Sequence, residues 1–264
     1  MTNQTLTLHI LVGCPFSVRC MIAAKFCDID VKFVIYSHMK QLKTKEYLFL
    51  NPNATAPTLV TDNGVLTESE PIARYFGYLN DSSNINGATN FDKAKVDMIM
   101  QKINLDRPQF QWFNFMAVGA SNYTKEKFEE MTISIYTVLN YYDKLLAQNQ
   151  YLIGNYITLA DIDLLALLYG PRRIWIPKDI VSKFENVLRW FNNLTHQKFF
   201  ADIFGNVHDP IRQFPLLNPI ACKQYFDDWM SQTYMGRCQK FQDLKTKIEG
   251  LKKEQAEQNA QLDI

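Results

Sequence analysis

Two kinds of hydrophobic pattern divide the chain. In the first part, apolar residues form short runs that are rich in β-branched residues and bounded by turn residues, which is typical of largely buried strands. These runs cover residues 5–12, 31–36, 56–61 and 65–67, and apolar residues recur at helical spacing over residues 16–26 and 70–79. The order, β-α-β and then ββα, predicts a small α/β sheet unit over residues 1–80.

Local signals fix the boundaries of several of these elements. The polar sequence Asp62-Asn63-Gly64 separates two strand runs and indicates a hairpin. Ser69 is expected to cap the helix that follows, since a serine side chain accepts a hydrogen bond from the first turn. The polar, lysine-containing residues 37–50 predict a loop and a short helix.

The second part of the chain has a different periodicity. Beyond a polar linker at residues 81–90, the strand-like runs stop and apolar residues follow helical spacing. Helices are predicted over residues 91–118, 124–147 and 162–168, with one or two more over residues 180–205. Thr158 and Asp161 form a capping-box variant before an apolar helix, which is a structural role. We therefore expect an all-helical domain over residues 91–210.

The tail, residues 211–264, changes character again. A short helical stripe is formed by Phe241, Leu244, Ile248 and Leu251, and nearly all residues after it are polar. The stripe is shorter than the three to four heptads that a coiled coil needs. A helix packed on the body of its own chain and a helix laid against a partner protein both fit this pattern.

Composition and charge exclude several classes of protein. Of 264 residues 47% are hydrophobic, which is enough for a packed core and too much for a disordered chain. Lys and Arg number 28 against 27 Asp and Glu, so the positive excess of a nucleic-acid-binding protein is missing. The apolar runs end well before the ~18 residues of a membrane helix, and the N-terminus lacks the features of a signal peptide. We expect a soluble, cytoplasmic protein that binds neither membranes nor nucleic acid.

One cysteine is the main candidate for chemistry. The five cysteines and four histidines include no Cys-x-x-Cys or His-x-x-x-His pair, so neither a disulfide framework nor a metal site is expected. Cys14 follows a strand run and begins a helix, where unpaired N–H groups and the helix dipole favour the nucleophilic thiolate. An inert, buried thiol is the alternative. Arg19 in the same helix would either assist this thiolate or lie solvated on the helix surface.

The order of elements and several motifs resemble the cytosolic glutathione transferases. The motifs are Asn51-Pro52, Ala56-Pro57, Leu66-Thr67-Glu68-Ser69 and Ile72-Ala73-Arg74-Tyr75, with Gly154 and the Thr158–Asp161 box further on. The resemblance covers residues 6–208. It implies a glutathione transferase fold, an α/β thioredoxin-like N-terminal domain plus an all-α C-terminal domain, here with an extra C-terminal helical tail.

The same resemblance implies a site for glutathione as cofactor. Pro57 would form a cis peptide bond, so that Ala56 offers its backbone N–H and C=O to the tripeptide. Glu68 and Ser69 would bind the γ-glutamyl end of glutathione. Further contacts would come from Phe16 and from Lys43, with Lys45 as the alternative to Lys43. A relative without catalysis would keep these residues for folding alone, with Ser69 as a helix cap.

Within this superfamily, two resemblances lead to different functions. One resemblance is to the transferase-like region of elongation factor 1 gamma, which uses the fold to hold a nucleotide-exchange complex together. It rests on residues 22–26 and 189–191 and on Gln197, Phe199, Phe200, Gly205 and Val207. The Cys14–Arg19 segment, CPFSVR, resembles omega-class transferases and glutaredoxins, whose first cysteine attacks glutathione disulfides. Ser17 replaces a second cysteine, so such chemistry would use one thiol.

These patterns favour a non-catalytic or weakly catalytic interaction module, the scaffold subunit of a larger assembly. Its expected partners are other protein subunits, bound through residues 221–264, and a second copy of the chain. The alternative is an enzyme, a glutathione-dependent thiol transferase that uses Cys14.

Overall fold

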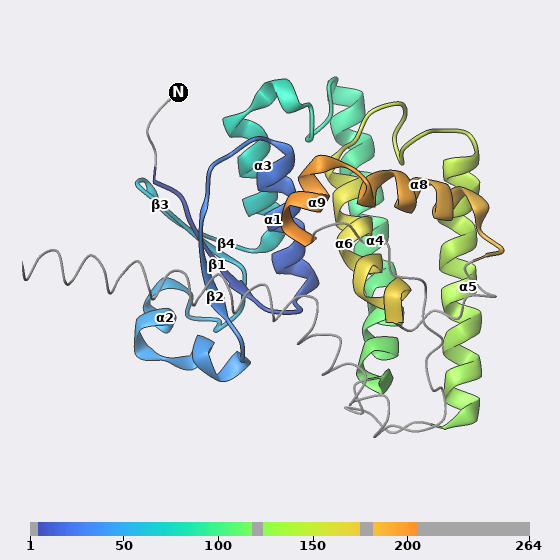
Figure 1. The fold of residues 1–264 in the computed structure, drawn as a ribbon, viewed down its shortest axis with the longest axis horizontal. Helices are drawn as coiled ribbons and strands as arrows, with labels where there is room; N and C mark the ends of the chain where they lie inside the picture. The colour runs from blue at the N-terminus through green and yellow to red at the C-terminus, as the bar shows by residue number, and fades with distance from the viewer. Residues whose placement is uncertain (1–4, 118–123, 175–181, 205–264) are drawn as a thin grey trace, which may run out of the picture.

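The computed structural model describes residues 5–117, 124–174 and 182–204. A four-stranded sheet with its helices lies beside a set of long helices (Figure 1). The predicted order of elements, β-α-β, ββα and then helices alone, is confirmed for this part of the chain. The predicted tail at residues 211–264 lies outside the described residues.

The elements of the first part are short. They are β1 (Thr7–Leu11), α1 (Pro15–Phe26), β2 (Lys32–Tyr36), the 3₁₀ helix η1 (Met39–Lys43), α2 (Lys45–Leu50), β3 (Thr58–Thr61), β4 (Gly64–Thr67) and α3 (Ser69–Leu79). A second 3₁₀ helix, η2 (Asp81–Ser83), precedes the helical part. The helical part has α4 (Asn90–Ala117), α5 (Lys125–Ala147), α6 (Leu159–Ile174), α8 (Glu185–Thr195) and α9 (Lys198–Phe204). The helix predicted at residues 162–168 is thus longer at both ends.

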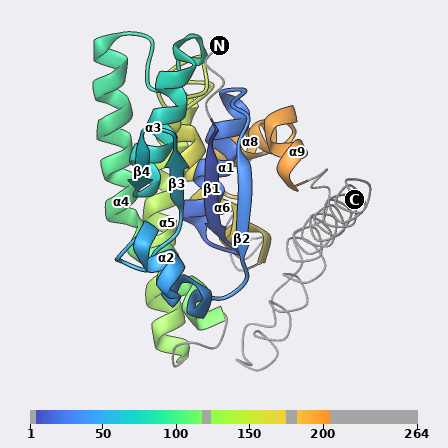
Figure 2. The same cartoon turned by 90° about the vertical axis from the view of Figure 1, so that its left-hand side faces the viewer.

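The sheet is mixed, with the strand order β2-β1-β3-β4. β1 is parallel to β2 and antiparallel to β3, and the predicted hairpin joins β3 to β4. Figure 2 shows the four strands side by side, with α1 and α3 behind them and α2 in front. Because side chains alternate along a strand, Leu8 and Ile10 are fully buried in the core, whereas His9 lies on the opposite face, against Tyr47 of α2.

Helix α6 is the centre of the helical part. All residues from 159 to 169 are buried, as expected for a helix that is covered on every side. It packs against α1 on one side and α4 on the other, so it connects the sheet unit to the helical part. Among the described helices none is long and apolar enough to cross a bilayer.

The structural role predicted for Thr158 and Asp161 is confirmed. One carboxylate oxygen of Asp161 accepts hydrogen bonds from the amide and the hydroxyl of Thr158, at 2.9 and 3.0 Å. The other oxygen accepts from the amide of Leu152 and from the indole of Trp190, both at 2.9 Å. The box therefore also fixes α8, which carries Trp190.

The predicted linker at residues 81–90 is packed against both parts. Ile85 and Asn86 are buried, and the side-chain amide of Asn86 donates to the carbonyl of Arg74 in α3 at 3.0 Å. The carbonyl of Ile85 accepts from the amide of Leu159, the first residue of α6, at 2.8 Å. A Cβ at Gly77 would collide with both Ile85 and Asn86, so the approach of the linker to α3 requires this glycine.

Candidate functional site

Cys14 lies at the junction between β1 and α1. Gly13, at a φ of 75°, turns the chain out of the strand, and Cys14 adopts an extended conformation as the N-terminal flanking residue of α1. Pro15 is the first helical residue, a position where a missing N–H costs no hydrogen bond. The Cys14 thiol is partly exposed and lies 3.7 Å from the carbonyl oxygen of Ala56. The structure therefore brings together Cys14 and Ala56, two of the predicted site residues.

The loop that carries Ala56 is fixed by buried polar side chains. The Tyr47 hydroxyl donates to the carbonyl of Thr55 at 2.5 Å and shares a hydrogen bond of 3.0 Å with the Thr58 hydroxyl. The side-chain amide of Asn51 donates to the same Thr55 carbonyl at 2.9 Å. The Ala56–Pro57 peptide bond is cis, as the resemblance implied.

Tyr47 also belongs to an aromatic group on the outer face of the sheet. The rings of Tyr36 and Tyr47 meet edge to face at 5.1 Å, and His9 Nδ1 lies 2.9 Å from the Tyr36 hydroxyl. Burial lowers the pKa of His9 and raises the pKa of both tyrosines. Through the hydrogen bonds of Tyr47 to Thr55 and Thr58, this group stabilises the loop that carries Ala56. Sequence reasoning missed it.

Ser69 does not cap α3, which corrects the expected capping role. The helix begins at Ser69 itself, the flanking residue is Glu68, and no side chain caps this end. Glu68 has a φ of 66°, a conformation that costs energy for a residue with a side chain. The Ser69 hydroxyl is instead turned inward and accepts a hydrogen bond from Arg19 at 3.2 Å. Glu68 is exposed at the start of this helix.

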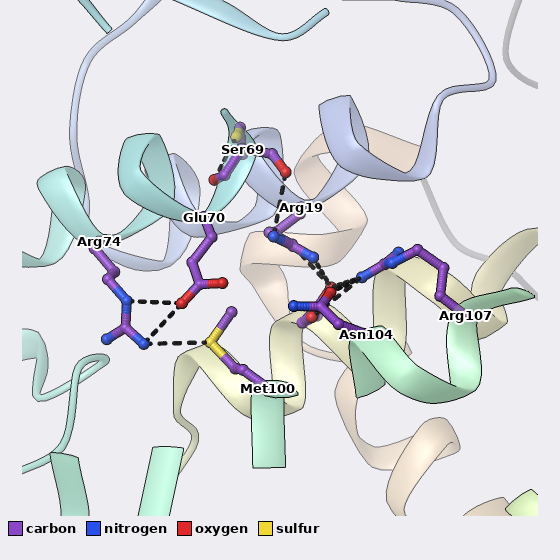
Figure 3. A network of polar contacts seen from close by, with 9 residues as sticks. Arg19, Ser69, Glu70, Arg74, Met100, Asn104 and Arg107 are labelled. Atoms are coloured by element: carbon purple, nitrogen blue, oxygen red, sulfur yellow. Dashed lines mark hydrogen bonds and ion pairs between the residues drawn. The ribbon is translucent and has the colours of Figure 1, made fainter. Parts of the chain in front are cut away.

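Arg19 is buried, so the second of its two alternatives, a solvated arginine on the helix surface, is wrong. Its Nε donates to Asp163 of α6 at 2.8 Å, and a second nitrogen of the group forms an ion pair with the same carboxylate. Arg107 of α4 reaches this carboxylate from the other side, at 3.0 Å from Oδ1 and 3.3 Å from Oδ2. Figure 3 shows the two guanidinium groups pointing toward each other from α1 and α4. We call Arg19, Ser69, Arg107 and Asp163 the interdomain charge cluster.

The ring of Phe16 packs against the two arginines of this cluster. The guanidinium carbons of Arg107 and Arg19 are 4.6 and 5.8 Å from the centre of its ring, which are cation–π distances. The predicted glutathione contact Phe16 is therefore engaged by two arginines. Lys43 is exposed at the end of η1, and among the described residues it has no hydrogen bond to the other predicted site residues.

The other described cysteines have no access to solvent. Cys20 and Cys27 are completely buried, and burial raises the pKa of both, that of Cys27 to about 11. Since the thiolate is the reactive form, Cys14 is the one thiol in the described ranges that is placed for chemistry. Within the same ranges no group of His, Cys, Asp and Glu residues is arranged to hold a metal ion.

Comparison with known families gives two matches. The family model described as glutathione S-transferase, N-terminal domain, matches residues 8–83, and the model for the C-terminal domain of the same family matches residues 107–198. "Elongation factor 1-gamma 3" of Oryza sativa subsp. japonica is 31% identical over 207 residues, which are 77% of this chain and 49% of that protein. The chain thus spans about half the length of this relative.

Two further proteins are similar over most of their own length. "Glutathione S-transferase stcT" of Emericella nidulans is 28% identical over 202 residues, covering 75% of this chain and 91% of the relative. Among solved structures, the glutathione transferase URE2P6 from Phanerochaete chrysosporium, in complex with oxidized glutathione, superposes with a TM-score of 0.68. That superposition covers 76% of this chain and 94% of the other at 19% identity, so it supports the fold alone.

Proposed function

We propose that this chain, which belongs to the glutathione S-transferase superfamily, serves as a cytoplasmic protein-interaction module of the elongation factor 1-gamma type. The observation that carries the proposal is the match to the rice elongation factor, which spans 77% of this chain. In this proposal the two matched domains form the body of a scaffold subunit, and catalysis is weak or absent.

The buried contacts between the domains support a scaffold role. A scaffold has to present its surfaces in a constant relative orientation. Here α6 packs against both α1 and α4, and Asp163 holds arginines from both of these helices. Contacts of this kind resist relative motion of the domains, because separating them would expose or unpair buried charges.

A second copy of the chain is one proposed partner, and the outer face of α4 is the surface we propose for it. Phe91, Met98 and Leu105 are 72%, 59% and 64% exposed. They are spaced seven residues apart, so they lie along one side of the helix. Exposed apolar groups in such a stripe are typical of protein interfaces. Met98→Glu should therefore lower the mass measured by light scattering from dimer to monomer, whereas Lys144→Glu on α5 should not.

The scaffold proposal is tested by reconstitution. The tagged full chain is mixed with the other elongation factor 1 subunits of its host and separated by size-exclusion chromatography. We expect a complex of fixed stoichiometry that forms equally well with Cys14→Ser and is lost when residues 221–264 are deleted. Elution of the full chain apart from those subunits would contradict the proposal.

A second candidate function is glutathione-dependent thiol transfer, and the position of the Cys14 thiol favours it. The thiol is partly exposed at the start of α1, next to the Ala56 carbonyl. In the proposed reaction, the Cys14 thiolate attacks the glutathione sulfur of a mixed disulfide and releases the other thiol. A glutathione thiolate then attacks the Cys14–glutathione disulfide, which restores Cys14 and forms oxidised glutathione.

This reaction is measured with a glutathione mixed disulfide as substrate. If the chain is an enzyme, Cys14→Ser abolishes turnover, while Cys27→Ser leaves it unchanged because that thiol is buried. Turnover at the wild-type rate in Cys14→Ser would remove this candidate.

A further inference from the structure

Two Asn-Gly dipeptides occur in the sequence, Asn63-Gly64 and Asn86-Gly87, and the structure places them in opposite environments. An asparagine before glycine readily loses its side-chain amide, because glycine has no Cβ to hinder the approach of its backbone nitrogen to the asparagine side chain. The reaction still requires that the side chain and this nitrogen be free to meet. The folded structure therefore decides which of the two asparagines reacts.

Asn63-Gly64 lies in the turn between β3 and β4. Both residues are exposed, and a Cβ placed at Gly64 would have no atom within 4 Å. The Thr61 hydroxyl holds the turn, since it accepts from the Asn63 backbone amide at 3.1 Å and donates to the Gly64 carbonyl at 2.9 Å. Neither bond uses the side-chain amide of Asn63. Thr61 and Gly64 are the last pair of the ladder, and the ends of strands open most readily, so this turn has both the space and the freedom to react.

Asn86-Gly87 is held in place on both sides. Asn86 is 7% exposed, and its side-chain amide donates to the carbonyl of Arg74 at 3.0 Å. The backbone amide of Gly87 donates to the carbonyl of Asn84 at 2.9 Å. A Cβ at Gly87 would lie 2.5 Å from the backbone nitrogen of Lys93 in α4, so this segment is also closely packed. The two reacting groups are therefore kept apart while the protein is folded.

We infer that Asn63 is a site of spontaneous deamidation in the folded protein, whereas Asn86 is protected. The backbone nitrogen of Gly64 attacks the side-chain carbonyl carbon of Asn63, and the new C–N bond closes a succinimide ring. The bond from this carbon to the side-chain nitrogen breaks, and ammonia leaves with the proton of the Gly64 amide. Water then adds to either ring carbonyl and breaks its bond to the ring nitrogen, which gives aspartate or isoaspartate. No step oxidises or reduces a group.

The modification changes the charge of the whole chain. One neutral amide becomes a carboxylate, so the formal net charge at pH 7 falls from +1 to 0. Proteins without net charge associate more readily, because electrostatic repulsion between copies is lost. The new carboxylate also lies next in sequence to Asp62, whose side chain accepts a hydrogen bond from the Thr5 amide at 3.1 Å. Deamidation therefore adds negative charge to a turn that already carries it.

The isoaspartate product also changes the backbone of the hairpin. Its main chain runs through the side-chain carbon and is one atom longer in the turn. Because turn geometry sets the register of the two strands, the pairing of β3 with β4 should weaken. These strands begin after Pro57 and end before Glu68, so the hairpin connects two of the predicted site residues. The reaction needs neither glutathione nor a protein partner, and the inference therefore goes beyond the proposed function.

Peptide mapping by mass spectrometry tests this inference on the full chain. The native protein is incubated at neutral and at mildly alkaline pH, and the peptides that contain residues 63 and 86 are quantified in the same digest, with an unincubated sample as the reference. We expect Asn63 to convert to aspartate and isoaspartate, faster at alkaline pH because the attacking nitrogen must lose its proton. In water labelled with oxygen-18, the new carboxylate should take up the label. Asn86 should react about tenfold more slowly or less, since its reaction requires local opening of the linker.

Unfolding and two variants serve as controls. In urea the rates of the two asparagines should converge, because both precede glycine and the difference between them comes from the fold. On ion exchange, Asn63→Gln should greatly slow the appearance of the more acidic form, whereas Asn155→Gln, at an exposed asparagine followed by tyrosine, should not. Equal conversion of Asn63 and Asn86 in the native chain, whether both react or neither does, would overturn the inference. So would formation of the acidic species at the wild-type rate in Asn63→Gln.

Discussion

The boundary between the domains and the Cys14 end of the sheet use polar groups in different ways. At the boundary, charged side chains from residues 144 positions apart, Arg19 and Asp163, meet in the protein interior. Around Cys14, the contacts are neutral and involve backbone carbonyls, those of Thr55 and Ala56. The difference implies that variants at the boundary affect the whole fold, whereas variants near Cys14 affect a loop.

The largest expected effect is that of Asp163→Ala, which leaves two arginines buried without a counter-charge. Removing one partner of a buried ion pair costs about 3–5 kcal/mol, and here it leaves both Arg19 and Arg107 unpaired. Urea unfolding should show this loss of stability. Asp202→Ala is the matched control, because its partner Lys198 is exposed and such pairs contribute about 0–1 kcal/mol. A similar small loss in Asp163→Ala would mean that the boundary is no more sensitive than the surface.

The next largest effect is expected for Asp161→Ala. The change leaves the donors of Thr158, Leu152 and Trp190 buried without an acceptor. We expect the free energy of unfolding to fall by about 2–4 kcal/mol, since each unsatisfied buried group is costly. The fluorescence of Trp190 should change in the folded state. A variant with wild-type stability would contradict the role of this box in fixing α8.

Acid should destabilise the sheet through His9. Burial lowers the pKa of His9 in the folded protein below its usual 6.5, so below that pH the unfolded chain takes up a proton that the folded chain does not. Stability is therefore unaffected above pH 6.5 and falls as the pH decreases, at most by about 1.4 kcal/mol per pH unit for one proton. Unfolding measured between pH 7 and pH 5 should be less pH-dependent in His9→Asn. An unchanged profile would show that other groups cause the acid sensitivity.

The smallest effect is expected near Cys14 itself. Tyr47→Phe removes the hydrogen bonds to Thr55 and Thr58, which should cost about 1 kcal/mol. Since these bonds hold the Ala56 loop, the rate at which Cys14 reacts with a thiol reagent should also change. Tyr78→Phe, on an exposed side chain, should alter neither property. A larger loss than that of Asp163→Ala would reverse the ranking of the two regions.

The elements of the fold could be predicted because their signals are local. The Asp62-Asn63-Gly64 turn, the strand runs and the Thr158–Asp161 box act over a few residues, and each occurs as expected. The position of Cys14 at the start of α1 also follows from its neighbours in sequence.

The charge cluster was not predictable in this way. Arg19 looks like any surface arginine of a helix until α6 is packed against α1, and the partners Asp163 and Arg107 are distant in sequence. The misassigned role of Ser69 has the same origin. Its hydroxyl is oriented by Arg19, a tertiary contact, rather than by the first turn of its own helix. A weak signal existed in Asp163, a charged residue within an otherwise apolar segment.

The close packing of the linker against Gly77 of α3 has a consequence for how the protein unfolds. The segment after α3 packs directly on that helix, and its Ile85 carbonyl accepts a hydrogen bond from the first amide of α6. Unfolding of either domain therefore removes a contact that stabilises the other. Unfolding should then proceed as one cooperative transition rather than two. A bulkier residue at Gly77 would displace this segment from α3 and should weaken the coupling between the two halves.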